Sequence, residues 1–73
     1  MDLLRAPLGR DVIVIDVVGG ICLKQRLFAL GIVPGKKIKK VVQHPMGGPI
    51  IVEINGSRFA LGRGMASKVI VEV

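Results

Sequence analysis

The sequence has one histidine, one cysteine and no tryptophan or tyrosine, and these shortages argue against several functions. With a single cysteine, no disulfide can form within the chain, so a reducing compartment is allowed. Its two phenylalanines are the only aromatic rings, too few for a platform on which single-stranded bases stack. This composition argues against a nucleic-acid partner.

Cys22 and His44 offer little material for catalysis or metal binding. Cys22 falls in an expected helix and His44 in an expected strand, so a working nucleophile and base depend on the fold, and we interpret Cys22 as a small buried apolar residue. His44-Pro45-Met46 with Cys22 would supply nitrogen and sulfur, but no second histidine or neighbouring carboxylate completes a ligand set. We expect no enzyme, no cofactor and no strong metal site in one chain, and leave open a weak site shared between copies.

The charge is strongly basic, with 11 Lys and Arg against 5 Asp and Glu and a net charge of +6. A basic domain of this size favours RNA, an anionic membrane surface or an acidic protein as partner. The dense part of this charge is Lys36, Lys37, Lys39 and Lys40. These lysines have two interpretations: a solvated strand that resists pairing with another chain, or a docking patch for an acidic surface.

Length and hydropathy predict a single domain over residues 1–73. No apolar run approaches the ~20 residues of a membrane helix, so we expect no transmembrane segment. Residues 1–5 lack the basic start and apolar middle of a signal peptide. We therefore expect a cytoplasmic protein.

One stretch has a clear helical pattern, with three leucines spaced at i, i+4 and i+7: Leu23, Leu27 and Leu30. Gly31 supplies the left-handed residue just past the helix end, which lets Ile32 fold back onto Leu27 in a Schellman-type stop. Pro34-Gly35 then fits the two central positions of a type II turn. The polar residues of this helix, Lys24, Gln25 and Arg26, are expected to face water.

The rest of the chain is typical of strands, which we expect at residues 12–18, 36–44, 50–54, 57–61 and 68–73. Asn55-Gly56 predicts a type I′ hairpin that pairs Glu53 with Arg58 and Val52 with Phe59. Residues 62–67 are expected to form a connecting turn. Roughly five strands and one short amphipathic helix predict a mainly β fold, a small partly open barrel of SH3-like or OB-like type.

Two charged residues bear on which strand faces are buried. Asp16 is expected to mark the wet face of the first strand. In the second strand, alternation places Lys40 on the same side as Ile38 and Val42. Either a bulge shifts the register, or the stem of Lys40 lies along the core edge with its amine in water, and we favour the stem.

The helix, its exit and the loop after the second strand resemble the FeoA family, the small proteins encoded with bacterial ferrous-iron import systems. The resemblance spans about residues 8–73 and rests on Arg26-Leu27, Leu30-Gly31-Ile32, Pro34-Gly35, Pro45-Met46-Gly47-Gly48-Pro49 and Leu61. It implies an SH3-like barrel with an inserted helix, and an accessory role to FeoB, a membrane permease with a cytosolic GTPase domain. The chain departs from the family in Gly62-Arg63-Gly64, which has one basic residue and no acid, and in Lys40, where an apolar residue is more usual.

The resemblance and the charge together favour a non-enzymatic interaction module that binds the cytosolic GTPase or the membrane part of FeoB at the inner face of the membrane. The candidate contact residues are Arg26, Lys36, Lys37, Lys39, Pro45, Met46, Gly47, Gly48 and Pro49. Four alternatives stay open: an RNA-binding barrel, a stand-alone relative of the SH3-like domains of metalloregulators, a metal carrier, and a proline-peptide binder that would lack the usual aromatic groove. Weak self-association is also left open.

Overall fold

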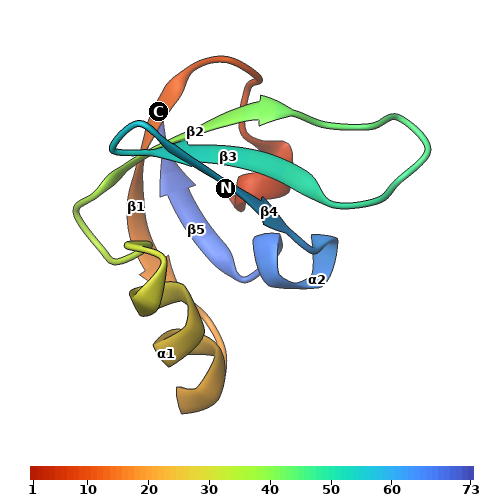
Figure 1. Ribbon diagram of the computed structural model, residues 1–73. Coiled ribbons are helices and arrows are strands. Elements are labelled where there is room, and N and C mark those ends of the chain that lie inside the picture. Colours follow the sequence, from red (N-terminus) through yellow and green to blue (C-terminus); the bar gives the residue numbers. More distant parts are fainter.

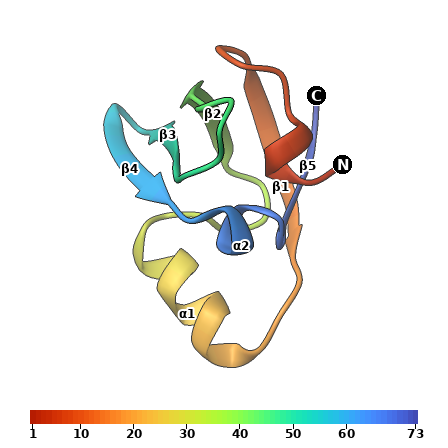
Figure 2. The ribbon, with the colours of Figure 1, turned by 90° about the vertical axis from the view of Figure 1, so that its right-hand side faces the viewer.

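Five strands and three short helical segments make up the computed structural model, which describes residues 1–73 (Figure 1). In chain order they are η1 Leu3–Arg5, β1 Asp11–Val17, α1 Ile21–Ala29, β2 Lys37–Val42, β3 Ile50–Ile54, β4 Ser57–Leu61, α2 Arg63–Ala66 and β5 Val69–Glu72. The strands form one antiparallel sheet in the order β4-β3-β2-β1-β5. Because the curled sheet does not pair β4 with β5, the expected mainly β, partly open barrel is confirmed (Figure 2).

The inner face of the sheet buries an aliphatic core closed by both α-helices and η1. The fully enclosed side chains are Leu3, Ala6, Val12, Val14, Val17, Leu27, Ile32, Ile38, Ile50, Val52, Ile54, Leu61, Ala66, Val69 and Val71. Asp16 is exposed, as expected, but alternation alone does not explain why Val14 and Val17 are both buried. The register of β1 against β5 shifts between Val14 and Asp16, and this bulge turns Val17 inward.

The β3–β4 hairpin follows its turn sequence. Asn55 has a φ of 53° and Gly56 a φ of 82°, the two positive values that a type I′ turn requires. Glu53 lies opposite Arg58 and Val52 opposite Phe59, as predicted. The observed register confirms the hairpin prediction. The prediction was possible because the turn sequence alone sets the register of the two adjoining strands.

Helix α1 ends in the predicted Schellman motif. The N–H of Ile32 donates to the carbonyl of Leu27 at 2.9 Å, and the N–H of Gly31 donates to the carbonyl of Phe28 at 2.9 Å. Gly31 has a φ of +88°, in the left-handed region. The start of the helix is weaker, because Gly20 is its N-cap and makes no side-chain hydrogen bond.

Replacing Gly31 by alanine is expected to destabilise the fold by about 1–2 kcal/mol, the cost of a left-handed backbone for a residue with a Cβ atom. A Cβ there would meet only the Cγ2 atom of Ile54, at an ordinary 3.7 Å, so the cost is conformational rather than steric. The measurement is the urea midpoint followed by circular dichroism. Gly64→Ala is the control, since Gly64 lies in α2 with open space around it. Equal midpoints for the two variants would contradict this account.

The expectation that the amine of Lys40 reaches water is wrong. Its side chain is 2% exposed, and Nζ donates to the carbonyl of Leu4 in η1 at 2.7 Å. A bulge does follow, between Lys40 and Val42, but it leaves Lys40 inside. Lys40 is accommodated because η1 covers this end of the core and offers a free carbonyl.

Two smaller expectations were also wrong. Residues 62–67 do not form a simple turn, because Arg63–Ala66 make the short helix α2, which buries Ala66 in the core. Cys22 is exposed rather than buried. The apolar side of α1 is narrow, with Leu27 as its one fully buried residue, so Cys22 points away from the core.

Candidate partner-binding surface

The contact residues predicted from the sequence fall in three separate places. Arg26 lies on α1, the lysines 36, 37 and 39 lie at the start of β2, and residues 45–49 form the loop beyond the other end of β2. Figure 1 shows that loop projecting from the side of the molecule away from α1. The lysines and the loop therefore do not form one continuous surface.

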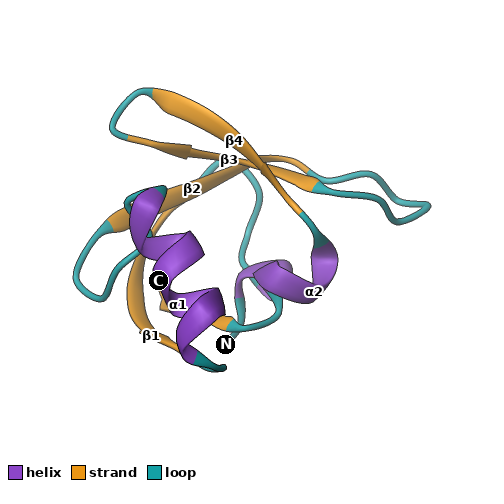
Figure 3. Ribbon diagram, turned by 60° about the horizontal axis from the view of Figure 1, so that its bottom comes forward, coloured by secondary structure: helices purple, strands orange, loops and turns teal.

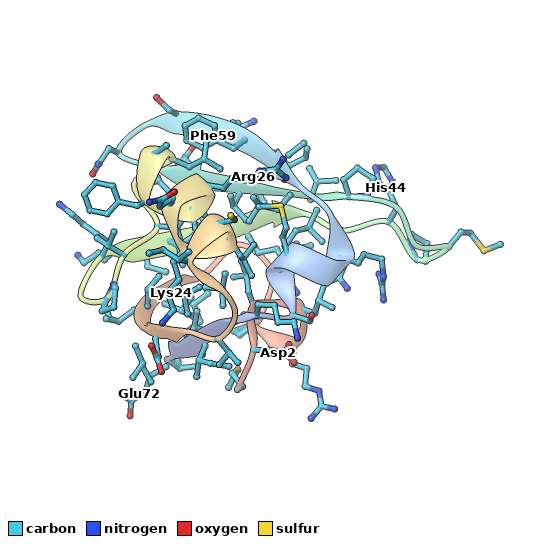
Figure 4. All side chains as sticks on the ribbon, turned by 90° about the horizontal axis from the view of Figure 1, so that it is seen from below. Asp2, Lys24, Arg26, His44, Phe59 and Glu72 are labelled. Carbon is cyan, nitrogen blue, oxygen red and sulfur yellow. The ribbon has the colours of Figure 1, made fainter.

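Arg26 is exposed, but it does not join the lysines. In Figure 4 Lys24 and Arg26 leave α1 on opposite sides, with Arg26 on the side where Phe59 lies. The prediction had singled out Arg26 and not Lys24. Lys24, which the prediction left out, lines an apolar hollow beside α1, whereas Arg26 does not.

The lysines of β2 do not protect a sheet edge, because β2 is the central strand and pairs with both β1 and β3. This rules out the edge-protection interpretation. Lys39 lies in register with Asp11 on β1 and with Glu53 on β3. Glu53 in turn accepts a hydrogen bond from Nε of Arg58 on β4 at 3.3 Å. Directly opposed residues share a sheet face, so four strands carry a row of alternating charge.

This row leaves Lys36 and Lys37 as the uncompensated part of the cluster. Both are exposed, whereas Lys39 is half-buried between acidic neighbours. Lys37 lies opposite Ile13 rather than a carboxylate, and the only ion pair in the structure is the one between Arg58 and Glu53. Free positive charge is therefore concentrated at the turn that enters β2.

The projecting loop carries the predicted residues Pro45 to Pro49. Gly47 and Gly48 have φ values of +96° and +86°, and the N–H of Gly47 donates to the carbonyl of His44 at 3.2 Å. Met46 at the tip is 96% exposed. The loop thus presents an apolar side chain to a partner, but nothing around it forms a cavity.

A hollow of about 190 Å³ lies between α1, the end of β1 and the turn before β2. Its apolar lining is Val17, Phe28, Ile32, Val33 and Pro34. Lys24 and Asp16 contribute its charged lining. Figure 3 shows α1 as a separate arm beside the strands, which the chain enters from β1 and leaves toward β2.

The sequence prediction missed this hollow, although one signal was present. Phe28 is a large apolar residue outside the leucine face of α1, and it is 70% exposed. Aromatic residues are enriched at protein interfaces, so an aromatic residue outside the apolar face of a short helix is a candidate contact residue. The other lining residues come from distant segments, so the sequence alone did not assemble the site.

The side chains that could ligate a metal do not gather in one place. No group of three or more His, Cys, Asp or Glu side chains lies together. Cys22 lies on α1, whereas His44 lies in the projecting loop at the far end of the molecule (Figure 4), so the two do not form a pair. No helix combines the length and apolar character needed to cross a bilayer.

The fold and site define a small SH3-like protein: a curled, open five-stranded sheet with an added helix and an apolar hollow beside it. The FeoA domain matches residues 1–73, the full length of the sequence. The chain belongs to the FeoA family, the accessory proteins of ferrous-iron transport.

Relatives and solved structures agree with this assignment. An Fe(2+) transport protein A of Methanocaldococcus jannaschii is 41% identical over 64 residues, which are 88% of this chain and 76% of that protein. A crystal structure of an iron uptake regulatory protein (FeoA) has a TM-score of 0.90 at 38% identity, covering 97% of this chain and 93% of the other. FeoA of Stenotrophomonas maltophilia, a prokaryotic SH3 domain protein crystallised with zinc, has a TM-score of 0.83 at 33% identity, covering 99% and 89%.

Proposed function

We propose that this protein binds the cytosolic part of a FeoB-type ferrous-iron permease and acts on transport by binding, without catalysing a reaction. The observation that carries the proposal is the pair of exposed lysines without an ion-pair partner, Lys36 and Lys37, at the turn into β2, close in the chain to Pro34 of an apolar hollow that Lys24 also lines. Membership of a transport accessory family supplies the partner class. Such a protein works in the cytoplasm and meets the membrane's inner face through its partner.

The arrangement suits a protein partner better than a nucleic acid. Protein interfaces combine an apolar centre with a polar rim, and the hollow with its flanking lysines has this composition. RNA binding would require a continuous basic stripe, whereas the charge on β1 to β4 alternates in sign across the sheet.

The experiment is an amide-resolved NMR titration of this protein with the soluble GTPase domain of the permease encoded in the same genome, at low and high salt. Shifts confined to the turn before β2 and to α1 are expected. Shifts in residues 45–49 would add the projecting loop to the interface, and shifts around Arg26 would add the opposite side of α1. The absence of shifts at both salt concentrations would overturn the proposal for this domain of the partner.

Reversing the charge of Lys36 and Lys37 to glutamate is expected to weaken binding about tenfold or more, or about 1.4 kcal/mol. Each exposed pair that is lost contributes only about 0.2–1 kcal/mol, and repulsion from the partner's acidic surface adds to this. The matched control reverses Arg10 and Arg63, which are also exposed and change the net charge equally. Equal losses for both double variants would show that only overall charge matters.

A further inference from the structure

The hollow has the size of one large side chain. An apolar protein cavity of about 150 Å³ accommodates benzene, so a hollow of about 190 Å³ has room for one aromatic ring or branched aliphatic group. Its wall includes Phe28, whose ring is 70% exposed and would be covered by such a guest. Large apolar anchors in small pockets provide most of the affinity of many interfaces.

One basic residue lines the hollow, and a second lies close to the lining in the chain. Lys24 lines it directly, and Lys36 follows Pro34 of the lining by two positions. The turn that carries Lys36 is tied to β1, because the N–H of Val14 donates to the carbonyl of Lys36 at 2.9 Å and the N–H of Gly35 donates to the carbonyl of Val14 at 2.7 Å. Hydrogen bonds between main-chain atoms thus fix the backbone at Lys36, whereas α1 positions the backbone of Lys24.

The single carboxylate of the hollow, that of Asp16, has one hydrogen bond within the chain and keeps its negative charge. Oδ1 of Asp16 accepts a hydrogen bond from the N–H of Val17 at 2.8 Å. Lys24, Lys36 and Lys37 have no ion-pair partner in the structure. The charged lining is therefore balanced between Lys24 and Asp16, and the exposed Lys36, two positions beyond Pro34, adds a further positive charge nearby.

We propose that the hollow receives one phenylalanine- or leucine-sized side chain from a short acidic segment of the protein partner, with the segment's flanking carboxylates against Lys24 and Lys36. This deepens the proposed function, on which it rests, by naming the chemistry of the segment that is recognised. Charge complementarity selects this occupant over a second copy of the chain, since each copy carries a net charge of +6.

The probe is a short glutamate-rich peptide with one central phenylalanine, titrated into isotope-labelled protein and followed by NMR. Amide shifts are expected in Val17, Lys24, Phe28 and Val33, around the hollow. A peptide with central alanine is expected to bind at least tenfold more weakly, and one with lysine in place of glutamate is expected not to bind. Absence of binding by the phenylalanine peptide, or shifts confined to another face, would overturn the inference.

Matched variants test the two parts of the recognition. Phe28→Ser is expected to weaken binding of the peptide at least tenfold, whereas Ile21→Ser is expected to leave it unchanged. Both residues lie on α1 and are similarly exposed, at 70% and 72%, but only Phe28 lines the hollow. For the charge, Lys24→Glu is expected to weaken binding more than Arg10→Glu, because Arg10 precedes β1 at the end opposite Asp16. Equal effects within either pair would overturn the inference.

The outcomes separate this inference from the proposed function. If the permease domain binds wild-type and Phe28→Ser protein equally, the hollow is not the recognition site, while the proposed partner stands. If the acidic peptide occupies the hollow but the permease domain does not bind, the partner is wrong and the chemistry of the hollow stands. Shifts around the hollow that grow with protein concentration in the absence of peptide would assign it to a second copy and overturn the inference.

Discussion

Replacing Lys40 by alanine is expected to lower the free energy of unfolding by about 2–5 kcal/mol, the range for removing a long buried side chain. Lys40 is 2% exposed and packs its stem inside the sheet. Its amine also holds η1 in place through the 2.7 Å hydrogen bond to the carbonyl of Leu4. The alanine variant loses both the packing and the hydrogen bond, and equilibrium unfolding in urea measures the sum.

The variant Lys40→Met separates packing from charge. Methionine restores a long flexible stem, so its free energy of unfolding should fall only by the value of the hydrogen bond to Leu4, about 1–3 kcal/mol. This fall is partly offset because methionine buries no charge. We expect the order of stability to be wild type, then methionine, then alanine. A methionine variant as unstable as the alanine variant would show that the stem contributes little.

The pH dependence of the same comparison has a definite sign. Burial lowers the pKa of Lys40 from its ordinary value of 10.5, and the charge of Asp2 opposes this only in part. Between the lowered pKa and 10.5 the unfolded chain binds more protons at this site than the folded protein. The stability of the wild type should therefore rise relative to Lys40→Met as pH increases through that window. Parallel stability curves for the two proteins would contradict a buried lysine.

The parts of the fold that the sequence predicts are those that adjoining residues determine. Asn55-Gly56 fixes the hairpin because two positive φ values leave one register for the strands on either side. Gly31 fixes the helix end for the same reason, since the hydrogen bonds that close it come from the next residues along the chain. Both features depend on segments of a few residues and on no distant contact.

Which lysines are buried and which have acidic neighbours depends on contacts between distant parts of the chain, so the sequence alone could not decide it. The amine of Lys40 donates to the carbonyl of Leu4, 36 residues away, in a short helical turn that the sequence analysis did not predict. Lys39 is balanced by residues on two neighbouring strands, which only the register of the sheet reveals. The sequence therefore identified a basic cluster but could not show that Lys40 is buried, that Lys39 lies between two acidic neighbours, and that Lys36 and Lys37 are exposed.

In the candidate site, too, the features set by adjoining residues could be predicted and those set by distant contacts could not. The exposed loop of residues 45–49 could be predicted from its prolines and glycines, but its distance from the lysines could not. The hollow is formed by α1, the end of β1 and the turn before β2, and its shape depends on how α1 is held against the sheet. Leu23 and Leu30 pack against the core only partly buried, so the main anchor of α1 is its one fully buried residue.

That anchor is Leu27, and replacing it by alanine is expected to destabilise the protein by about 2–5 kcal/mol. Leu27 is the one fully buried residue of α1, at 0% exposure, and its carbonyl accepts the hydrogen bond that closes the helix. Helix α1 has nine residues and no side-chain cap at its start. Isolated helices shorter than about 12–15 residues are marginal in water, so α1 depends on this contact.

The effect should reach beyond global stability to the hollow, because Lys24 and Phe28 lie on the turns of α1 that Leu27 holds in place. In Leu27→Ala, amide exchange in α1 is expected to accelerate more than exchange in β2 and β3, and binding of the acidic phenylalanine peptide is expected to weaken under conditions where the sheet stays folded. Leu23→Ala is the control, since Leu23 is only half-buried on the same face. If α1 loses its protection while the peptide binds as before, recognition does not use the hollow; if α1 keeps its protection, Leu27 is not the anchor.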